Sequence, residues 1–280
     1  MKNIVEQAEQ ISKEYPHSRL LIYCWRGGMR SAAIAWLLDL YGFKVQTLAG
    51  GYKRFRNFAL DVFRHAYTFK ILGGYTGSGK TELLKALRSE GELIVDLESL
   101  AGHKGSAFGN IGLPPQPSQE MFENRLAMQI SEAHQHSNPD KGIWLEDESQ
   151  RIGQVNIPSD LWKTMRNSRI FFIDIPFEER LQHLVEEYGC LDMEKMKEAI
   201  ERIREKLGGL NAKMAIQHLE EKNTIEGFRI LLNYYDRYYQ KALHNREGLI
   251  SLLHRIESKS LSPENANLLI RASKTTAQEV

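Results

Sequence analysis

Short apolar runs alternate with longer amphipathic ones along most of this chain. The runs at 20–23, 44–48, 68–72, 93–97, 142–145 and 170–175 have the length and composition of buried strands. Helical periodicity follows two of them, at 31–40 and 80–89. Strands that alternate with helices are typical of a parallel sheet with crossover helices. The pattern therefore predicts an α/β protein with two successive series of such units.

The remaining segments are helical or polar. Residues 52–70 mix basic and aromatic side chains, and we predict a linker helix with a basic face there. After Pro176 the pattern predicts helices at 178–188, 193–207, 211–221 and 225–244. From 258 the chain is rich in Ser, Lys, Asn and Thr, which favours a flexible tail. We therefore expect domains at 1–60 and 61–257 and a tail at 258–280.

The composition excludes several classes of protein but does not indicate a function. The chain has 280 residues, 42% of them hydrophobic and 26% charged, with a net charge of +1. These values exclude a disordered chain, and any nucleic-acid contact must come from a local basic patch. No apolar run reaches the length of a membrane span or of a signal-peptide core, so we expect a cytoplasmic protein with no membrane partner. Two cysteines are too few for a disulfide framework or a Cys-rich zinc site, and we interpret Cys190 as structural.

A glycine-rich loop lies between the predicted strand 68–72 and the helix that follows. Its sequence, Gly-Tyr-Thr-Gly-Ser-Gly-Lys-Thr, fits the phosphate-binding pattern G-x-x-x-x-G-K-[ST] without a mismatch. Backbone N–H groups, the helix N-terminus and a lysine there favour an anion, and the final threonine could hold Mg²⁺. We predict that this loop binds a phosphate or diphosphate through Gly74, Thr76, Gly77, Ser78, Gly79, Lys80 and Thr81.

Carboxylates follow two of the predicted strands. Glu146, Asp147 and Glu148 end one apolar run, and Asp96 and Glu98 follow another. Carboxylates at strand ends beside a phosphate loop often bind Mg²⁺ or act as acid or base, but they also cap helices. The sequence leaves both roles open.

A second polar loop joins the strand at 20–23 to the helix at 31–40. It contains Cys24, Arg26, two glycines and Arg30. Backbone N–H groups, a helix N-terminus and two arginines near a sulfur favour a thiolate or an anionic adduct on it. We therefore predict Cys24 as a nucleophile, with Arg26 and Arg30 as its catalytic partners.

Both loops occur in one known family. The segment Leu-Ile-Tyr-Cys24-Trp-Arg-Gly-Gly-Met-Arg30-Ser31, followed by Leu48-Ala-Gly-Gly51-Tyr, resembles the second half of a rhodanese domain. Joined to the phosphate loop, to the segment His103-Lys-Gly-Ser-Ala-Phe-Gly109 and to the segment 146–153, it resembles the bacterial tRNA 2-selenouridine synthases. The resemblance extends from about residue 20 to 239. It implies a partial rhodanese-like α/β domain followed by a P-loop domain with a helical C-terminal region.

The resemblance also implies a reaction. The family transfers a geranyl group from geranyl diphosphate to the sulfur of the wobble 2-thiouridine of tRNA, then replaces S-geranyl by selenium from selenophosphate. Cys24 would carry the selenium, and the P-loop would hold diphosphate rather than ATP. No permanently bound cofactor or metal is implied, with Mg²⁺ as a candidate ion. Further candidates for diphosphate or tRNA contact, or for acid–base chemistry, are His103, Lys104, Ser106 and Arg151.

One departure from the family pattern concerns the segment before Cys24, which has only 23 residues. The first strands of a rhodanese domain do not fit there, and about half of its sheet would have an unpaired edge. We expect a misassigned start codon, a separate polypeptide that completes the domain, or a degraded relative.

Contact with tRNA would depend on local basic patches. The linker offers Lys53, Arg54, Arg56, Arg64 and Lys70, and four tyrosines between 234 and 239 either stack bases or belong to the core. Two other functions stay open: a P-loop kinase or ATPase with a sulfur-carrier appendage, and a truncated relative that only geranylates or only binds tRNA.

Overall fold

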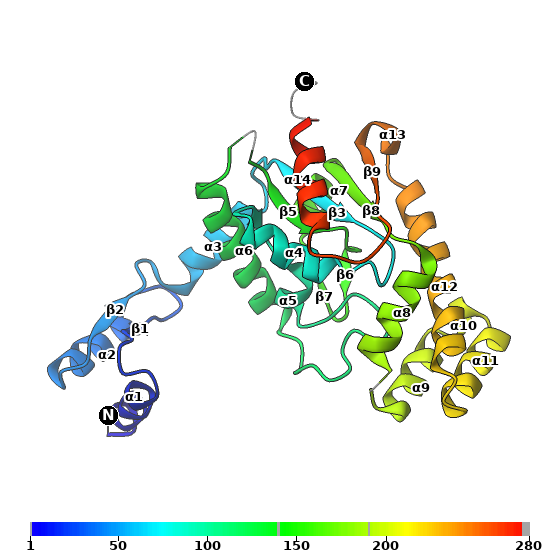
Figure 1. Ribbon diagram of the computed structural model, residues 1–280. Coiled ribbons are helices and arrows are strands. Elements are labelled where there is room, and N and C mark those ends of the chain that lie inside the picture. The colour runs from blue at the N-terminus through cyan, green and yellow to red at the C-terminus, as the bar shows by residue number, and fades with distance from the viewer. Residues whose placement is uncertain (1, 139–140, 190, 276–280) are drawn as a thin grey trace. The chain divides into compact units, whose positions relative to one another are not determined.

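The computed structural model describes residues 2–138, 141–189 and 191–275, which divide into two compact units (Figure 1). The first unit is Met1–Val62 and the second is Phe63–Val280. Cys190 lies outside the described residues.

The first unit is a small α/β layer. Its elements are α1 Lys2–Glu14, β1 Leu20–Ile22, α2 Met29–Leu40, β2 Val45–Thr47 and α3 Gly51–Val62. The two strands are parallel, with Leu20 opposite Val45 and Ile22 opposite Thr47. Val5, Ala8 and Leu38 form its buried core. The loop that carries Cys24 therefore lies between the end of β1 and the start of α2.

The second unit contains a five-stranded parallel sheet in the order β4-β5-β3-β8-β9. The strands are β3 Phe69–Gly73, β4 Leu93–Ile94, β5 Ile143–Glu146, β8 Arg169–Asp174 and β9 Leu253–Glu257. The first four coincide with runs expected from the sequence, and β9 was not expected. Parallel strands place the loops after β3, β4 and β5 at one edge of the sheet, which is where ligands bind in such folds. The α/β fold class is as expected.

Helices cover the sheet and extend beyond it (Figure 1). Those that follow the strands are α4 Lys80–Ser89, α5 Leu97–Ala101, α6 Gln119–Gln135 and α7 Ser159–Arg166. A short hairpin of β6 Arg151–Ile152 and β7 Val155–Asn156 precedes α7. The later helices are α8 Phe177–Tyr188, α9 Met193–Arg202, α10 Arg204–Leu207, α11 Gly209–Glu220, α12 Thr224–His244 and α13 Leu249–Leu252. Within the described part of the chain, no helix is long and apolar enough to cross a membrane.

The expected tail differs from the structure. Residues Asn265–Thr275 form helix α14, which packs against α4 and buries Ala266 and Leu269 in the core with Leu87. The apolar residues of α14 fall on one helical face, so the polar composition of the segment hid a packed helix.

The predicted linker helix also ends earlier than expected, at Val62. Lys70 lies inside β3 and is buried, with its Nζ 3.2 Å from Ser273 Oγ and 3.6 Å from Glu92 Oε2. The prediction that Lys70 contacts tRNA is therefore wrong, because its charge is neutralised inside the protein.

Candidate active site and cysteine loop

The loop between β3 and α4 has the geometry of an anion cradle. Gly77 and Gly79 have φ values of 80° and 69°, which other residues rarely adopt. A Cβ on Gly74 would lie 2.5 Å from Ser78 Oγ and 3.0 Å from a methyl carbon of Ile173, so a side chain there would displace its neighbours. Lys80 opens α4 and donates from Nζ to the Gly74 carbonyl at 3.1 Å. The lysine charge and the start of α4 therefore meet at the same loop.

Three of the carboxylates at the strand ends have structural roles. Asp96 caps α5 by accepting from the Ser99 N–H at 2.7 Å, and the fully buried Glu146 accepts from the Leu97 N–H at 2.9 Å. Asp147 accepts from Tyr239 Oη at 2.6 Å and from Arg246 Nη2 at 2.7 Å. These contacts occupy three of the five carboxylates that the sequence offered as acid, base or Mg²⁺ ligands.

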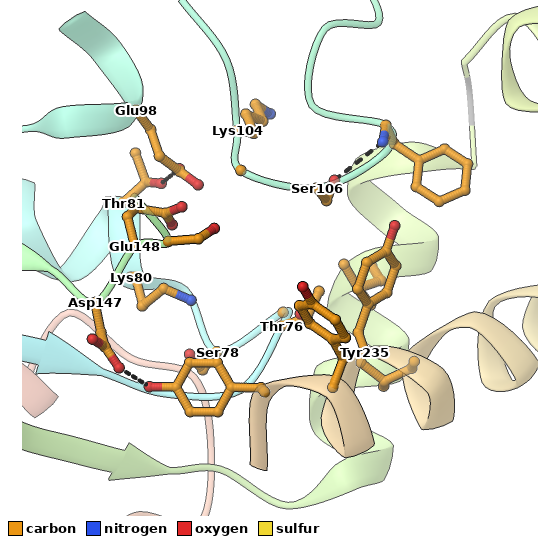
Figure 2. A pocket seen from close by; sticks show the side chains of 18 of the residues that line it. Thr76, Ser78, Lys80, Thr81, Glu98, Lys104, Ser106, Asp147, Glu148 and Tyr235 are labelled. Atoms are coloured by element: carbon orange, nitrogen blue, oxygen red, sulfur yellow. Dashed lines mark hydrogen bonds between the residues drawn. The ribbon is translucent and has the colours of Figure 1, made fainter. Parts of the chain in front are cut away.

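Glu98 and Glu148 point toward the phosphate loop (Figure 2). Thr81 Oγ1 donates to Glu98 Oε2 at 3.4 Å. A Cβ on Gly105 would lie 2.8 Å from an oxygen of Glu148 and 2.9 Å from one of Glu98, so the two carboxyl groups converge on this glycine. Burial and the neighbouring Glu98 charge raise the pKa of Glu148 to about 8, and burial raises that of Glu98. A pair that holds a proton at neutral pH repels an anion in the loop less than two carboxylates would.

No group of three or more His, Cys, Asp or Glu in the described ranges is arranged to hold a metal ion. Any Mg²⁺ at this site would have to use Thr81, Glu98 or Glu148 together with oxygens of a substrate.

A pocket of about 710 Å³ opens beside the phosphate loop. Its first end is polar and includes Thr76–Thr81, Glu98, Lys104, Ser106 and Glu148 (Figure 2). A second part, which we call the apolar arm, is lined by Phe108, Leu184, Tyr188, Ile203, Phe228, Leu231, Leu232 and Tyr235. The residues that α12 contributes are spaced three or four positions apart, so they lie on one face of that helix, which forms a wall of the apolar arm. The pocket thus joins an anion cradle to an apolar channel.

Arg180 holds the phosphate loop against the helices. Its Nη1 donates to the Thr76 carbonyl at 3.0 Å, and its guanidinium makes two bonds to Asp236, at 2.9 and 2.7 Å. Its Nε donates to the Ile175 carbonyl at 3.0 Å. Arg180 is only 3% exposed, so this ion pair is shielded from water. The loop is therefore positioned by α8 and α12 as well as by its own strand and helix.

Cys24 in the first unit lies at the strand–helix junction that the sequence predicted. Its Sγ is 3.4 Å from Ser31 Oγ, and this hydroxyl together with backbone N–H groups of the loop lowers the pKa of Cys24 to about 6. Gly27 and Gly51 touch: a Cβ on Gly27 would lie 2.3 Å from the Gly51 nitrogen. The turn around the sulfur therefore depends on two glycines from separate loops.

The basic residues around this turn are exposed. Arg26, Lys53 and Arg54 line a cavity of about 330 Å³, and Arg30 lies at the start of α2. Arg56 is half-buried on α3. The cysteine loop thus combines a thiol that is ionised at neutral pH with several cations.

Comparison with known protein families identifies the family to which this chain belongs. Residues 67–261 match the family described as the tRNA 2-selenouridine synthase AAA domain. The chain belongs to the tRNA 2-selenouridine synthase family. Members of the family are enzymes by name.

Several relatives in the family align over most of the chain. The tRNA 2-selenouridine synthase of Hydrogenovibrio crunogenus is 35% identical over 272 residues, which are 85% of this chain and 72% of that protein. The one of Nitrosomonas eutropha is 31% identical over 271 residues, 81% of this chain and 69% of the relative. The Nitrosomonas europaea protein is 39% identical over 178 residues, and the match spans 62% of this chain but only 45% of the relative.

The structure of this family member brings together some of the residues expected at the diphosphate site and separates others. Thr76–Thr81, Ser106, Lys104, Glu98 and Asp147 line the pocket. Arg151 does not: it lies exposed in the β6–β7 hairpin, and its Nε donates to the Gly153 carbonyl at 2.8 Å. His103 is buried against Gly109 and Gly153 rather than in the pocket, and burial lowers its pKa.

Sequence reasoning missed Arg180 and assigned no single role to Glu148 or Tyr235. Glu148 follows Glu146 and Asp147 in the sequence, which did not show that its carboxyl group converges with that of Glu98 on Gly105. Arg180 and Tyr235 lie on helices far along the chain, and Tyr235 Oη accepts from the Ala107 N–H at 3.1 Å. The spacing of apolar residues on α12 was visible in the sequence, but it did not show that this face borders a cavity.

Proposed function

We propose that this protein converts the wobble 2-thiouridine of tRNA to 2-selenouridine in the cytoplasm, with geranyl diphosphate and selenophosphate as small-molecule substrates. The observation that carries the proposal is the pocket at the phosphate loop, in which an anion cradle continues into an apolar arm. A prenyl diphosphate has the same two parts, a charged head and an apolar tail. A pocket of about 710 Å³ is within the usual size range for small-molecule sites.

The apolar arm argues for a prenyl chain over the base and ribose of a nucleotide. Leu184, Phe228, Leu231 and Leu232 belong to the buried core of the helical region. Burying a polar ribose against such walls would cost free energy, because its hydroxyls would lose water without gaining partners. A ten-carbon chain gains free energy there through the hydrophobic effect.

The first chemical step follows from this arrangement. The 2-thiouridine sulfur attacks C1 of the geranyl group, the C1–oxygen bond breaks and diphosphate leaves, while the N3 proton passes to water. Lys80 and the N–H groups at the start of α4 stabilise the charge that develops on the leaving diphosphate. Arg180 keeps Thr76 in place through its carbonyl.

The second step belongs to the rhodanese-like first unit. Geranylation makes the sulfur a better leaving group. Selenium from selenophosphate, held at Cys24, forms a bond to C2 of the base, and the C2–sulfur bond breaks with release of geranylthiol. The selenium–phosphorus bond is hydrolysed, and the phosphoryl group leaves as phosphate. A thiol whose pKa is about 6 is mostly thiolate at neutral pH, which is the reactive form. Arg26 and Arg30 favour anionic species at this sulfur, and Lys53, Arg54, Arg56 and Arg64 contact the tRNA backbone.

Thermal unfolding with candidate ligands tests the phosphate site. Geranyl diphosphate at about a hundred times its Kd should raise the Tm of the second unit by about 5–10 °C. Lys80→Ala should abolish this shift, while Lys163→Ala, an exposed lysine on α7, should keep it. A shift with ATP and Mg²⁺ but none with geranyl diphosphate would overturn the proposal in favour of a P-loop kinase or ATPase.

A further inference from the structure

The pocket continues along α12 past the phosphate loop, away from the apolar arm. Its lining residues on this helix run from Phe228 to Leu243, about 22 Å at 1.5 Å per residue. Tyr239, between these ends, adjoins the phosphate loop: its ring centre is 5.7 Å from that of Tyr75, and its hydroxyl bonds Asp147. The C-terminal part of α12 therefore forms a second extension, which we call the α7 arm.

The α7 arm differs in chemistry from the apolar arm. Helix α7 contributes Trp162 and Arg166, and the end of α12 contributes Ala242, Leu243 and Asn245. The Arg166 guanidinium lies 5.5 Å from the centre of the Trp162 ring. The α7 arm thus offers an aromatic face, a cation and an amide, where the apolar arm offers mostly aliphatic and aromatic surface.

The α7 arm is also the more open of the two. In the α7 arm, Ala242 and Asn245 are exposed and only Leu243 is buried. The apolar arm as defined above has no exposed member: five of its residues are buried, and Tyr188, Ile203 and Tyr235 are half-buried. A small molecule can be enclosed, but a base that belongs to a polynucleotide must enter from the surface with its backbone outside. This difference in exposure favours the apolar arm as the site of the small substrate and the α7 arm as the site of the polynucleotide.

The Arg166 side chain is free to contact a ligand. Among the described residues it forms no ion pair; besides its contact with the Trp162 ring, its Nη1 makes only a long contact of 3.5 Å to the Ala242 carbonyl. Burial, and after it the charge of nearby Arg246, lower the pKa of Arg166, while the Asp147 carboxylate that pairs with Arg246 opposes this shift. An uncommitted cation in this position favours a ligand with carbonyl or phosphate oxygens.

We propose that the α7 arm receives the nucleobase to be modified, with Trp162 stacked on the base and Arg166 and Asn245 contacting polar atoms of its edge or of the adjoining phosphate. Proteins recognise single-stranded RNA bases by stacking them on aromatic rings and bonding their edges. The base and the geranyl C1 then meet beside Lys80 from opposite directions along α12. This inference rests on the proposed function, since it takes the phosphate loop as the place of reaction.

Binding of an RNA hairpin tests the proposal without turnover. The probe is an anticodon stem–loop with 2-thiouridine at the wobble position, compared with the same hairpin abasic at that position. Wild-type protein should bind the base-containing hairpin about tenfold more tightly, the usual effect of one stacked base. Trp162→Ala should bind both hairpins equally weakly, and Trp162→Phe, which keeps an aromatic face, should restore the difference.

The outcomes separate this proposal from the proposed function. If Trp162→Ala still prefers the base-containing hairpin as strongly as wild type, or if wild type has no preference, the α7 arm is not the base site. The Tm shift with geranyl diphosphate should persist in Trp162→Ala, which shows that the second unit is folded. Loss of that shift in wild type, with the Trp162-dependent preference intact, would overturn the proposed function and leave the base site standing.

Discussion

Cys24 and Glu148 both ionise near neutral pH, for different physical reasons. Hydrogen bonds from Ser31 and the loop backbone lower the pKa of Cys24 to about 6 by stabilising the thiolate. Burial beside Glu98 raises the pKa of Glu148 to about 8 by destabilising its carboxylate. The first residue is activated as a nucleophile, and the second is kept uncharged next to an anion site.

The Cys24 thiolate can be titrated by its reaction with iodoacetamide. Mass spectrometry of the Cys24 peptide should give a half-maximal alkylation rate near pH 6. In Ser31→Ala the midpoint should move toward the value of about 8.5 for an ordinary cysteine, because the largest stabilising contact is gone. An unchanged midpoint in that variant would contradict the assigned cause.

Glu148 should make stability depend on pH. The folded state holds its proton up to about pH 8, whereas the unfolded carboxyl loses it near pH 4.3, so stability falls as pH rises through this window. Glu148→Gln cannot ionise, and its Tm should exceed that of wild type by a margin that grows from pH 5 to pH 8. The exposed Glu247→Gln is the matched control for loss of a carboxylate. A difference in Tm between Glu148→Gln and wild type that does not change with pH would show that the pKa of Glu148 is not raised.

At the scale of elements, the phosphate loop depends on helices remote in sequence. Arg180 on α8 connects the loop carbonyl of Thr76, 104 positions away, to Asp236 on α12, 56 positions away. The same helix α12 provides the walls of both arms of the pocket. A change in how α12 packs should therefore affect the loop as well as the arms.

Asp236→Ala should destabilise the second unit strongly. It leaves the buried Arg180 charge without a counterion, which costs about 3–5 kcal/mol in comparable pairs. Glu178→Ala removes the more exposed pair with Arg229, which water screens, and should cost much less. Denaturant unfolding of both variants measures the difference, and equal costs would show that Arg180 is not a buried anchor.

Local patterns predicted some elements and not others. The strands β3, β5 and β8 are continuous apolar runs, and the glycine motif marked the loop between β3 and α4, so each had a signal within a few residues. Strand β9 has no buried residue and three polar ones, His254, Arg255 and Glu257, and α14 buries only a narrow stripe, so neither forms a continuous apolar run. Lys70 was misplaced because Glu92 and Ser273 lie far along the chain.

At the scale of the whole molecule, each unit carries one chemically distinct loop. The first holds the thiolate of Cys24, and the second holds the phosphate loop and its pocket. The order of these loops, together with the segments 103–109 and 146–153, indicated the family from the sequence. The apolar arm and the α7 arm were not predictable, because their walls come mainly from α7, α8 and α12, which lie far apart in the sequence and are brought together only by the fold.

Nucleoside mass spectrometry tests the central claim, that the two loops perform successive steps on tRNA. Purified protein receives 2-thiouridine tRNA, geranyl diphosphate and selenophosphate. Wild type should form 2-selenouridine, Cys24→Ala should accumulate the S-geranyl nucleoside, and Lys80→Ala should form little of either. S-geranyl product at the wild-type level from Lys80→Ala, or unchanged tRNA with the wild-type protein, would contradict the account.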